Sequence, residues 1–308
     1  MSPHHHSFDL NDPESPVFGT GRFVGRAGLV RNLVTRLHRQ ESVLLYGGPK
    51  LGKTSLLLHL KWLLEQQGVS SSDGLTVQYG DCVEAEVRER FLAGDLQRSS
   101  ILLLDNCDQL LQQGLGNGKR LARGNGDGGP GRTMVWAGGR AWREFIRSER
   151  SGLTLAPVPL AILLSGEARA LVKPELTTDQ VDAILSYGGT HPYVLKILRA
   201  RMITDPTTDP AHIIGAVQVR LAPFFLACLE AVREPVERTL LDYLIRHPGP
   251  INPRQAAQAL GLPTVKPAAD TLCYLGLISR WNLNEGATLH ASCRLFNDWY
   301  GAHTGQPG

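Results

Sequence analysis

Residues 47–54 constrain this chain more than any other part of its sequence. They read Gly-Gly-Pro-Lys-Leu-Gly-Lys-Thr, the G-x-x-x-x-G-K-[ST] pattern of a phosphate-binding loop. The apolar run 43–46 before the loop predicts a buried strand, and the leucine-rich stretch after it predicts a helix. A strand, a glycine-rich turn and a helix in this order present main-chain N–H groups to a phosphate chain. The sequence therefore predicts nucleotide binding at this turn.

Two side chains of the loop have specific expected roles. Lys53 reaches the β- and γ-phosphates, and the Thr54 hydroxyl ligates Mg²⁺. The alternative is a glycine-rich turn that binds nothing, and these two residues together argue against it. The residues expected to contact ATP or ADP here are Gly47, Gly48, Pro49, Lys50, Leu51, Gly52, Lys53, Thr54 and Ser55.

Length and composition set the outer limits. A chain of 308 residues has room for two or three compact domains, and a net charge of +3 does not by itself indicate a nucleic-acid partner. The five cysteines include no C-x-x-C pair, so the sequence supports neither a zinc site nor a disulfide framework. No uninterrupted apolar run reaches the roughly 18 residues of a spanning helix, and no signal peptide is visible. We expect a cytoplasmic protein without a membrane partner.

The first half of the chain alternates between short apolar strands and helices, which predicts an α/β fold with a parallel sheet covered on both faces. Expected strands lie at 43–46, 75–79, 101–104, 133–137 and 155–160, and expected helices at 25–39, 54–67, 84–93, 108–112 and 141–149. Residues 113–132 interrupt this rhythm with eight glycines and four basic residues. We expect a disordered surface loop there, or alternatively a basic arm that contacts a partner or nucleic acid.

After residue 164 the pattern becomes helical. We expect a flexible leader at 1–20, a P-loop ATPase domain at 21–164, a helical lid at 165–234, a winged-helix domain at 235–303 and a short tail at 304–308. The winged helix is predicted from three helices at 236–246, 253–260 and 265–275, followed by two strands at 277–281 and 287–290 joined by an Asn-Glu-Gly turn.

Carboxylates near the predicted strand ends are candidates for the chemistry of ATP hydrolysis. Asp105 ends the run 101–104, and we expect it beside the phosphate loop on a neighbouring strand as a Mg²⁺ ligand; the alternative is a helix cap. Asn106 stands where many ATPases of this type place a catalytic Glu, and an amide cannot accept a proton from water. We therefore expect Asp108 to act as the base, with capping of its own helix as the alternative. Arg140, after the fourth strand, is expected to sense the γ-phosphate.

Several of these segments together resemble the signal-transduction ATPases with numerous domains (STAND), a branch of the AAA+ class. The matching segments are Phe23-Val24-Gly25-Arg26, the phosphate loop, Leu103-Leu104-Asp105-Asn106-Cys107-Asp108, Arg140, Gly189-Thr190-His191-Pro192 and Leu289-His290-Ala291. The resemblance implies that Val24 and Gly25 place main chain against adenine and that Pro192 packs on it. It also implies that His290 contacts the ADP β-phosphate. Ala291 replaces the acid that usually follows this histidine, so only His290 carries over.

The resemblance implies an ATP/ADP-dependent switch with slow hydrolysis. Such proteins usually add effector and sensor domains. We expect neither within these 308 residues, and therefore self-association or separate partner proteins, in bacterial signalling or anti-phage defence. The first alternative is a DNA-handling AAA+ ATPase, favoured by the basic glycine-rich segment. It is opposed by a predicted recognition helix at 263–275 whose only basic residue is Lys266. The second alternative is a scaffold that binds nucleotide without hydrolysing it.

Overall fold

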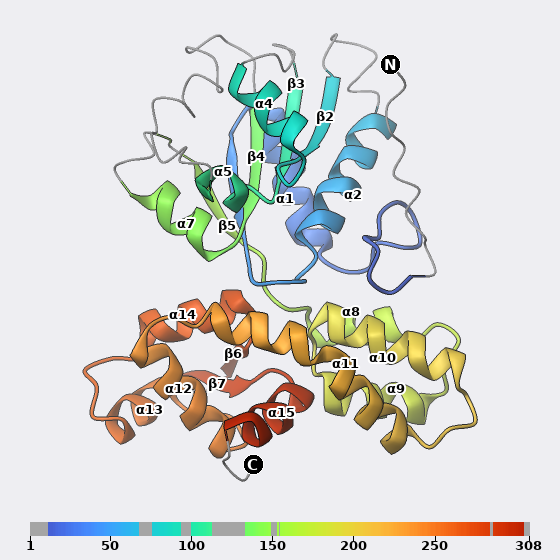
Figure 1. The fold of residues 1–308 in the computed structure, drawn as a ribbon, viewed down its shortest axis with the longest axis vertical. Coiled ribbons are helices and arrows are strands. Elements are labelled where there is room, and N and C mark those ends of the chain that lie inside the picture. Colours follow the sequence, from blue (N-terminus) through green and yellow to red (C-terminus); the bar gives the residue numbers. More distant parts are fainter. Residues whose placement is uncertain are drawn as a thin grey trace. The chain divides into compact units, whose positions relative to one another are not determined.

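The computed structural model describes residues 12–67, 76–93, 100–112, 133–148, 153, 155–283 and 286–304. The predicted glycine-rich loop, most of the leader and tail, and residues 284 and 285 of the predicted hairpin turn lie outside these residues. The chain forms two compact units (Figure 1): Met1–Gly47 with Gly52–Leu160, and Ala161–Gly308, to which Gly48–Leu51 are assigned.

The first unit is built on a five-stranded sheet in the order β2-β3-β4-β1-β5, in which every neighbouring pair is parallel. This confirms the predicted α/β class with a parallel sheet. The strands are β1 (Val43–Tyr46), β2 (Thr76–Asp81), β3 (Ser100–Asp105), β4 (Thr133–Gly138) and β5 (Ala156–Pro159). The helices are α1 (Ala27–His38), α2 (Lys53–Gln66), α4 (Ala85–Ala93), α5 (Asp108–Gln112) and α7 (Arg140–Arg147).

The strand order corrects one expectation. Asp105 was expected on a strand that neighbours β1, but β4 lies between β1 and β3. Apolar runs of similar length fit equally well at any central position of a parallel sheet, so the sequence pattern does not determine the order of the strands in the sheet. Asp105 nevertheless reaches the start of α2, as described below.

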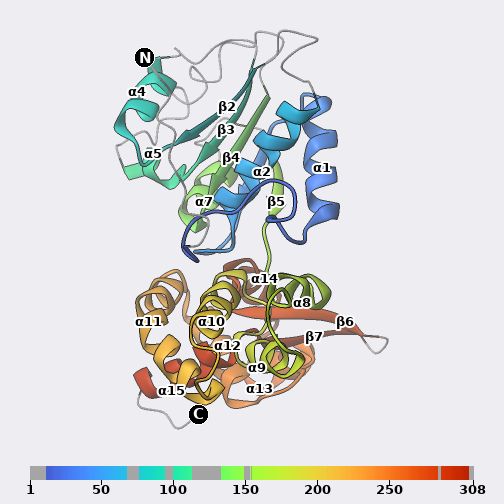
Figure 2. The same cartoon turned by 90° about the vertical axis from the view of Figure 1, so that its right-hand side faces the viewer.

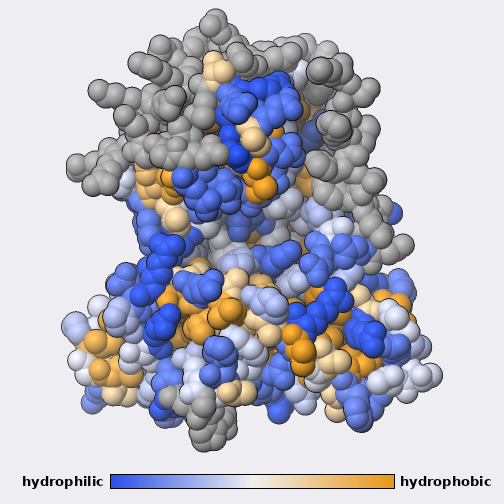
Figure 3. Space-filling view, in the orientation of Figure 1, coloured by the Kyte–Doolittle hydropathy of each residue, from blue (hydrophilic) through white to orange (hydrophobic). Residues whose placement is uncertain are grey.

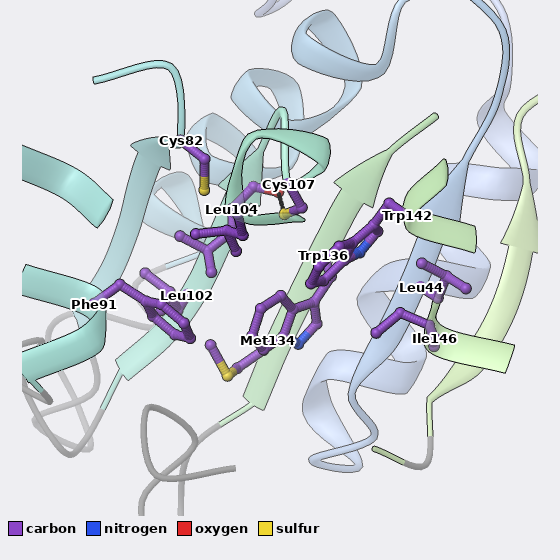
Figure 4. Close-up of a cluster of buried hydrophobic side chains, with 11 residues drawn as sticks. Leu44, Cys82, Phe91, Leu102, Leu104, Cys107, Met134, Trp136, Trp142 and Ile146 are labelled. Atoms are coloured by element: carbon purple, nitrogen blue, oxygen red, sulfur yellow. Dashed lines mark hydrogen bonds between the residues drawn. The ribbon is translucent and has the colours of Figure 1, made fainter. Parts of the chain in front are cut away.

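Alternate residues of the central strands face opposite sides of the sheet, as a period of two requires. One side packs against α4, α5 and α7, and Figure 4 shows the aromatic side chains gathered there. The Trp136 ring of β4 lies 5.5 Å from the Trp142 ring of α7 and 5.2 Å, edge-on, from the Phe91 ring of α4. On the other side α2 packs on β2, β3 and β4, and α1 packs on α2 (Figure 2). The sheet is thus covered on both faces, which explains why its central strands β1, β3 and β4 are mostly apolar.

The second unit is mainly helical. Its elements are α8 (Ser165–Val172), α9 (Thr178–Gly188), α10 (Pro192–Thr204), α11 (Pro210–Glu230), α12 (Pro235–Arg246), α13 (Pro253–Ala259), α14 (Lys266–Leu275), β6 (Ile278–Leu283), β7 (Gly286–Ala291) and α15 (Arg294–Thr304). Three helices followed by the antiparallel pair β6–β7 give the element order predicted for a winged helix. The segments expected as lid and winged helix pack into one unit, because α15 contacts both α9 and α11.

Helix α11 is long and apolar enough to cross a membrane by length and composition, a test that the core helix of a soluble protein also passes. Part of this helix is packed inside the second unit. The Phe225 ring lies 5.5 Å from the Phe296 ring and 5.6 Å from the Trp299 ring, both on α15. Val219 and Leu226 are exposed, and Figure 3 shows hydrophobic residues scattered among hydrophilic ones over this unit.

Candidate functional site

The phosphate loop has the backbone conformation that its sequence predicts. Gly52 has a φ of +90°, a left-handed conformation that favours glycine, and α2 begins at the next residue. The Lys53 ammonium donates a hydrogen bond to the Gly47 carbonyl over 3.0 Å. The Gly47 N–H in turn donates to the Gly138 carbonyl of β4 over 3.3 Å. Lys53 is therefore held over the start of the loop, at the N-terminus of α2.

Thr54 and Asp105 meet directly. The Thr54 hydroxyl donates to Asp105 Oδ2 over 2.5 Å, although the two residues come from α2 and from the end of β3. The Asp105 carboxylate is fully buried and accepts two further hydrogen bonds, from the Tyr79 hydroxyl over 3.2 Å and from the Asn106 N–H over 2.9 Å. Sequence reasoning identified Thr54 and Asp105 but missed Tyr79, which looked like an ordinary aromatic residue of a strand.

The pKa of the Asp105 carboxyl is subject to opposing effects. Burial raises the pKa of the Asp105 carboxyl, and the nearby Asp81 raises it further, whereas hydrogen bonds from Thr54 and Asn106 and the charge of Lys53 lower it. A hydroxyl and a carboxylate oxygen within 2.5 Å of each other form the hard-oxygen donor pair that Mg²⁺ uses beside substrate phosphates. Thr54 and Asp105 therefore fit the predicted metal.

Asp108 has a different environment from the one expected for a free base. Its Oδ2 accepts a hydrogen bond from the Gly139 N–H over 2.5 Å, and its Oδ1 accepts one from the Trp142 N–H over 2.9 Å. Both carboxylate oxygens are thus bound to main-chain donors at the start of α7. Asp108 satisfies the amino terminus of α7, which begins 32 residues later in the sequence, rather than capping the helix that it begins.

Arg140 is the first residue of α7, directly after β4 and its Gly138-Gly139 turn. Its side chain is only 8% exposed, and its Nε donates to Glu144 Oε1 over 2.6 Å, one turn along the helix. The β4 strand lies next to β1 in the sheet, so Arg140 follows the end of a strand that neighbours β1, in agreement with its expected place after the fourth strand. The role of Arg140 in sensing the γ-phosphate stays a prediction.

A second carboxylate lies beside Asp105 and was missed. The β2 strand ends at Asp81, which pairs in register with Asp105 at the end of β3. The Asn106 side chain reaches across and donates to Asp81 Oδ1 over 2.9 Å. The sequence prediction ended this strand at residue 79, because glycine at position 80 and aspartate at position 81 are poor strand formers. The signal that could have found Asp81 is that it comes just after a predicted strand, as Asp105 does.

The segment before α1 contacts the side chains of Ser55 and His59 on α2. The Phe23 ring stacks on the His59 ring at 4.2 Å, and His59 Nδ1 accepts a hydrogen bond from the Gly19 N–H over 3.3 Å. The Ser55 hydroxyl accepts one from the Val17 N–H over 3.1 Å. Residues 17–23 of the expected leader and motif are thus attached to α2. Val24 and Gly25 follow directly, and their contact with adenine stays a prediction.

Pro192 and His290 both lie in the second unit. Pro192 is the first residue of α10, where its missing N–H leaves no unsatisfied donor. His290 lies opposite Ser279 in the β6–β7 pair, and its Nε2 is 2.7 Å from the Ser279 hydroxyl. The Trp281 ring packs edge-on against the imidazole at 4.4 Å. Their predicted contacts with bound nucleotide stay predictions.

His290 also lines a cavity of about 480 Å³ inside the second unit. Thr190, from the loop before α10, Arg169 of α8 and Trp281 of β6 also line it. Arg169 is already paired with Asp182, at 2.7 Å. The cavity therefore joins two of the segments that resembled nucleotide-contacting motifs.

Comparison with known proteins bears on the fold. No protein-family model and no curated protein matches the sequence. Among solved structures, the Walker-type ATPase PABY2304 of Pyrococcus abyssi is similar with a TM-score of 0.59 and 12% identity, over 94% of this chain and 98% of that chain. The Aeropyrum pernix ORC2 protein, solved as ADPNP–ADP complexes, is similar with a TM-score of 0.50 and 10% identity, over 96% and 98%. The chain thus shares the fold of P-loop ATPases.

Proposed function

We propose that this protein binds ATP and ADP with Mg²⁺, hydrolyses ATP slowly, and uses the difference between the two nucleotides as a switch. The observation that carries this proposal is the Thr54–Asp105 hydrogen bond of 2.5 Å next to Lys53. A glycine-rich turn without a ligand has no need for a fully buried carboxylate at this point, since burying that charge is unfavourable.

Each residue of the site has a separate role in this proposal. Lys53 exchanges its bond to the Gly47 carbonyl for the β- and γ-phosphate oxygens, and the amino terminus of α2 adds partial positive charge. Thr54 and Asp105 hold Mg²⁺, which neutralises negative charge on the phosphate oxygens. Arg140, at the start of α7, senses the γ-phosphate and so distinguishes ATP from ADP.

The finer proposal is a STAND-type switch. It rests on the resemblance of the Phe23–Arg26, Pro192 and His290 segments to that family. In this reading ADP holds the units closed through Pro192 and His290, while ATP favours an opened or self-associated form. A ligand shifts such an equilibrium only through its different affinity for the two states. The protein then acts in the cytoplasm by controlling assembly or activation of partner proteins.

A DNA-handling AAA+ ATPase is the second candidate, supported by the basic residues of segment 113–132. Lys266 is the only basic residue of α14, and Asp270 of the same helix pairs with Arg280 at 2.8 Å. Because phosphate contacts dominate affinity for nucleic acid, this helix makes a weak recognition surface. A titration of duplex DNA at about 50 and 200 mM salt separates the candidates: binding that weakens by about 10³-fold or more favours the DNA reading.

The central experiment measures thermal stability with MgATP and MgADP, together with steady-state ATP turnover. At a concentration about 100 times the Kd, either nucleotide is expected to stabilise the fold by about 2.7 kcal/mol. The Lys53→Ala variant is expected to lose most of that stabilisation. Stabilisation without turnover supports a non-hydrolysing scaffold, and a protein stabilised by neither nucleotide contradicts the whole proposal. Particle mass with ATP and with ADP then tests self-association.

A further inference from the structure

The hydrolysis step of the proposed function requires a group that accepts the proton of the attacking water. Asn106 occupies the position where a catalytic Glu is common, and its amide cannot accept that proton. Because a carboxylate only accepts hydrogen bonds, the contact of 2.9 Å between Asn106 and Asp81 has the amide as donor. The amide at the usual place of the base is therefore bonded to a carboxylate on the neighbouring strand.

Three other carboxylates of the first unit are already engaged. Asp105 accepts hydrogen bonds on both oxygens and is the expected Mg²⁺ ligand. Asp108 accepts main-chain hydrogen bonds on both oxygens. Glu144 is paired with Arg140.

Asp81 differs from them. Its Oδ1 accepts from the Val83 N–H and from the Asn106 amide, each over 2.9 Å. Within the part of the chain that the structure describes, no hydrogen bond is recorded to its Oδ2. The turn bond to Val83 explains why an Asp stands before α4, but it does not explain the long-range bond to Asn106.

We infer that Asp81 is the catalytic base of ATP hydrolysis, a step that rests on the proposed function. The water oxygen forms a bond to the γ-phosphorus, and one water proton passes to the Asp81 carboxylate. The bond between the γ-phosphorus and the bridging oxygen breaks, and its electron pair stays on the β-phosphate of ADP. Asn106 is a positioning residue, because its amide fixes Oδ1 and leaves Oδ2 for the water.

The test compares Asp81→Asn with Asp81→Glu in the full chain. Asparagine keeps an oxygen for the Val83 N–H but accepts no proton. We expect Asp81→Asn to lower kcat by about 100-fold or more, while KM and the Kd of MgATP stay within about threefold of the wild type. Asp81→Glu keeps a carboxylate and is expected to turn over at least about tenfold faster than Asp81→Asn. The exposed Glu86→Gln variant, which removes a carboxylate from the first turn of α4, serves as the matched control.

Three results overturn the inference. One is a kcat of Asp81→Asn within about threefold of the wild type, and another is an equal loss in the Asn and Glu variants. The third is a Kd for MgATP that weakens together with kcat, which indicates a structural or metal-binding role. Failure of the proposed function looks different, because the wild type itself then shows no turnover. Melting curves with MgADP show whether each variant is folded.

Discussion

Asp108 secures the start of α7, and removing its carboxylate is expected to destabilise the first unit. The two N–H groups that it accepts belong to Gly139 and Trp142, and Trp142 is fully buried. Without the carboxylate, water has poor access to these donors, so they lose hydrogen bonds that the unfolded chain keeps. The Asp108→Ala substitution therefore tests the observed geometry directly.

The size of the effect follows from these two bonds. Hydrogen bonds to a charged group contribute about 1.5–3 kcal/mol each, whereas loss of an ordinary helix cap costs about 1 kcal/mol. We take about 3 kcal/mol for Asp108→Ala, the low end of the two-bond sum. For a unit of this size that corresponds to a decrease in Tm of about 6–12 °C. Asp108→Asn keeps one acceptor oxygen and is expected to lie between the wild type and Asp108→Ala.

Differential scanning fluorimetry of the nucleotide-free protein, paired with ATP turnover, measures both properties. Asp182→Asn, an exposed carboxylate of the second unit, is the control. An Asp108→Ala variant that melts within about 1 °C of the wild type refutes the capping argument, because the loss of two hydrogen bonds should lower the Tm by more than this. A loss of turnover by about 100-fold in both variants with unchanged Tm assigns Asp108 the role of base instead.

Four other substitutions test the site and the fold around it. In Gly138→Ala the new Cβ would lie 2.6 Å from the Trp142 Cβ, so we expect a loss of about 1–3 kcal/mol in chemical denaturation. Gly215→Ala, with open space in α11, should instead gain about 0.5–1 kcal/mol. Burial lowers the pKa of His59 below its ordinary 6.5, so the unfolded chain binds that proton more readily. Stability should therefore fall as pH decreases through 6.5, and less so in His59→Gln, when Tm is followed from pH 7.5 to 5.5. Asp105→Asn removes a charge that burial disfavours, so it should raise the Tm without nucleotide and abolish the added stabilisation by Mg²⁺.

The sequence predicted the elements of this fold well, because the signals are local. The loop pattern, the apolar runs and the helix periodicity each depend on neighbouring residues, and the strands and helices lie within a few residues of their expected bounds. Strand order is not local, and the position of β4 between β1 and β3 could not be read from apolar runs. Gly80 shows the same limit: a Cβ there would lie 2.9 Å from the Val87 side chain, so the glycine serves close packing of α4.

The candidate site was predicted in part for the same reason. Lys53 and Thr54 belong to a contiguous pattern, and Asp105 follows a clear strand. The partners of Asp108 lie 31 and 34 residues away in sequence, and only the packed structure brings them to it. Asp81 depends on the pairing of β2 with β3, which a single strand cannot reveal.

The parallel sheet itself explains why these groups meet. All five strands run the same way, so the ends of β2, β3 and β4 lie along one edge with Asp81, Asp105 and the Gly138-Gly139 turn. Burial of the Asp105 carboxyl at that edge raises its pKa and disfavours its charged form. In the proposed function, Asp105 and Thr54 would hold a divalent cation that offsets this unfavourable burial, so part of the free energy of metal binding would appear as added stability. On that proposal, the burial of Asp105 would make the stability of the fold sensitive to Mg²⁺ and nucleotide, as the proposed switch requires.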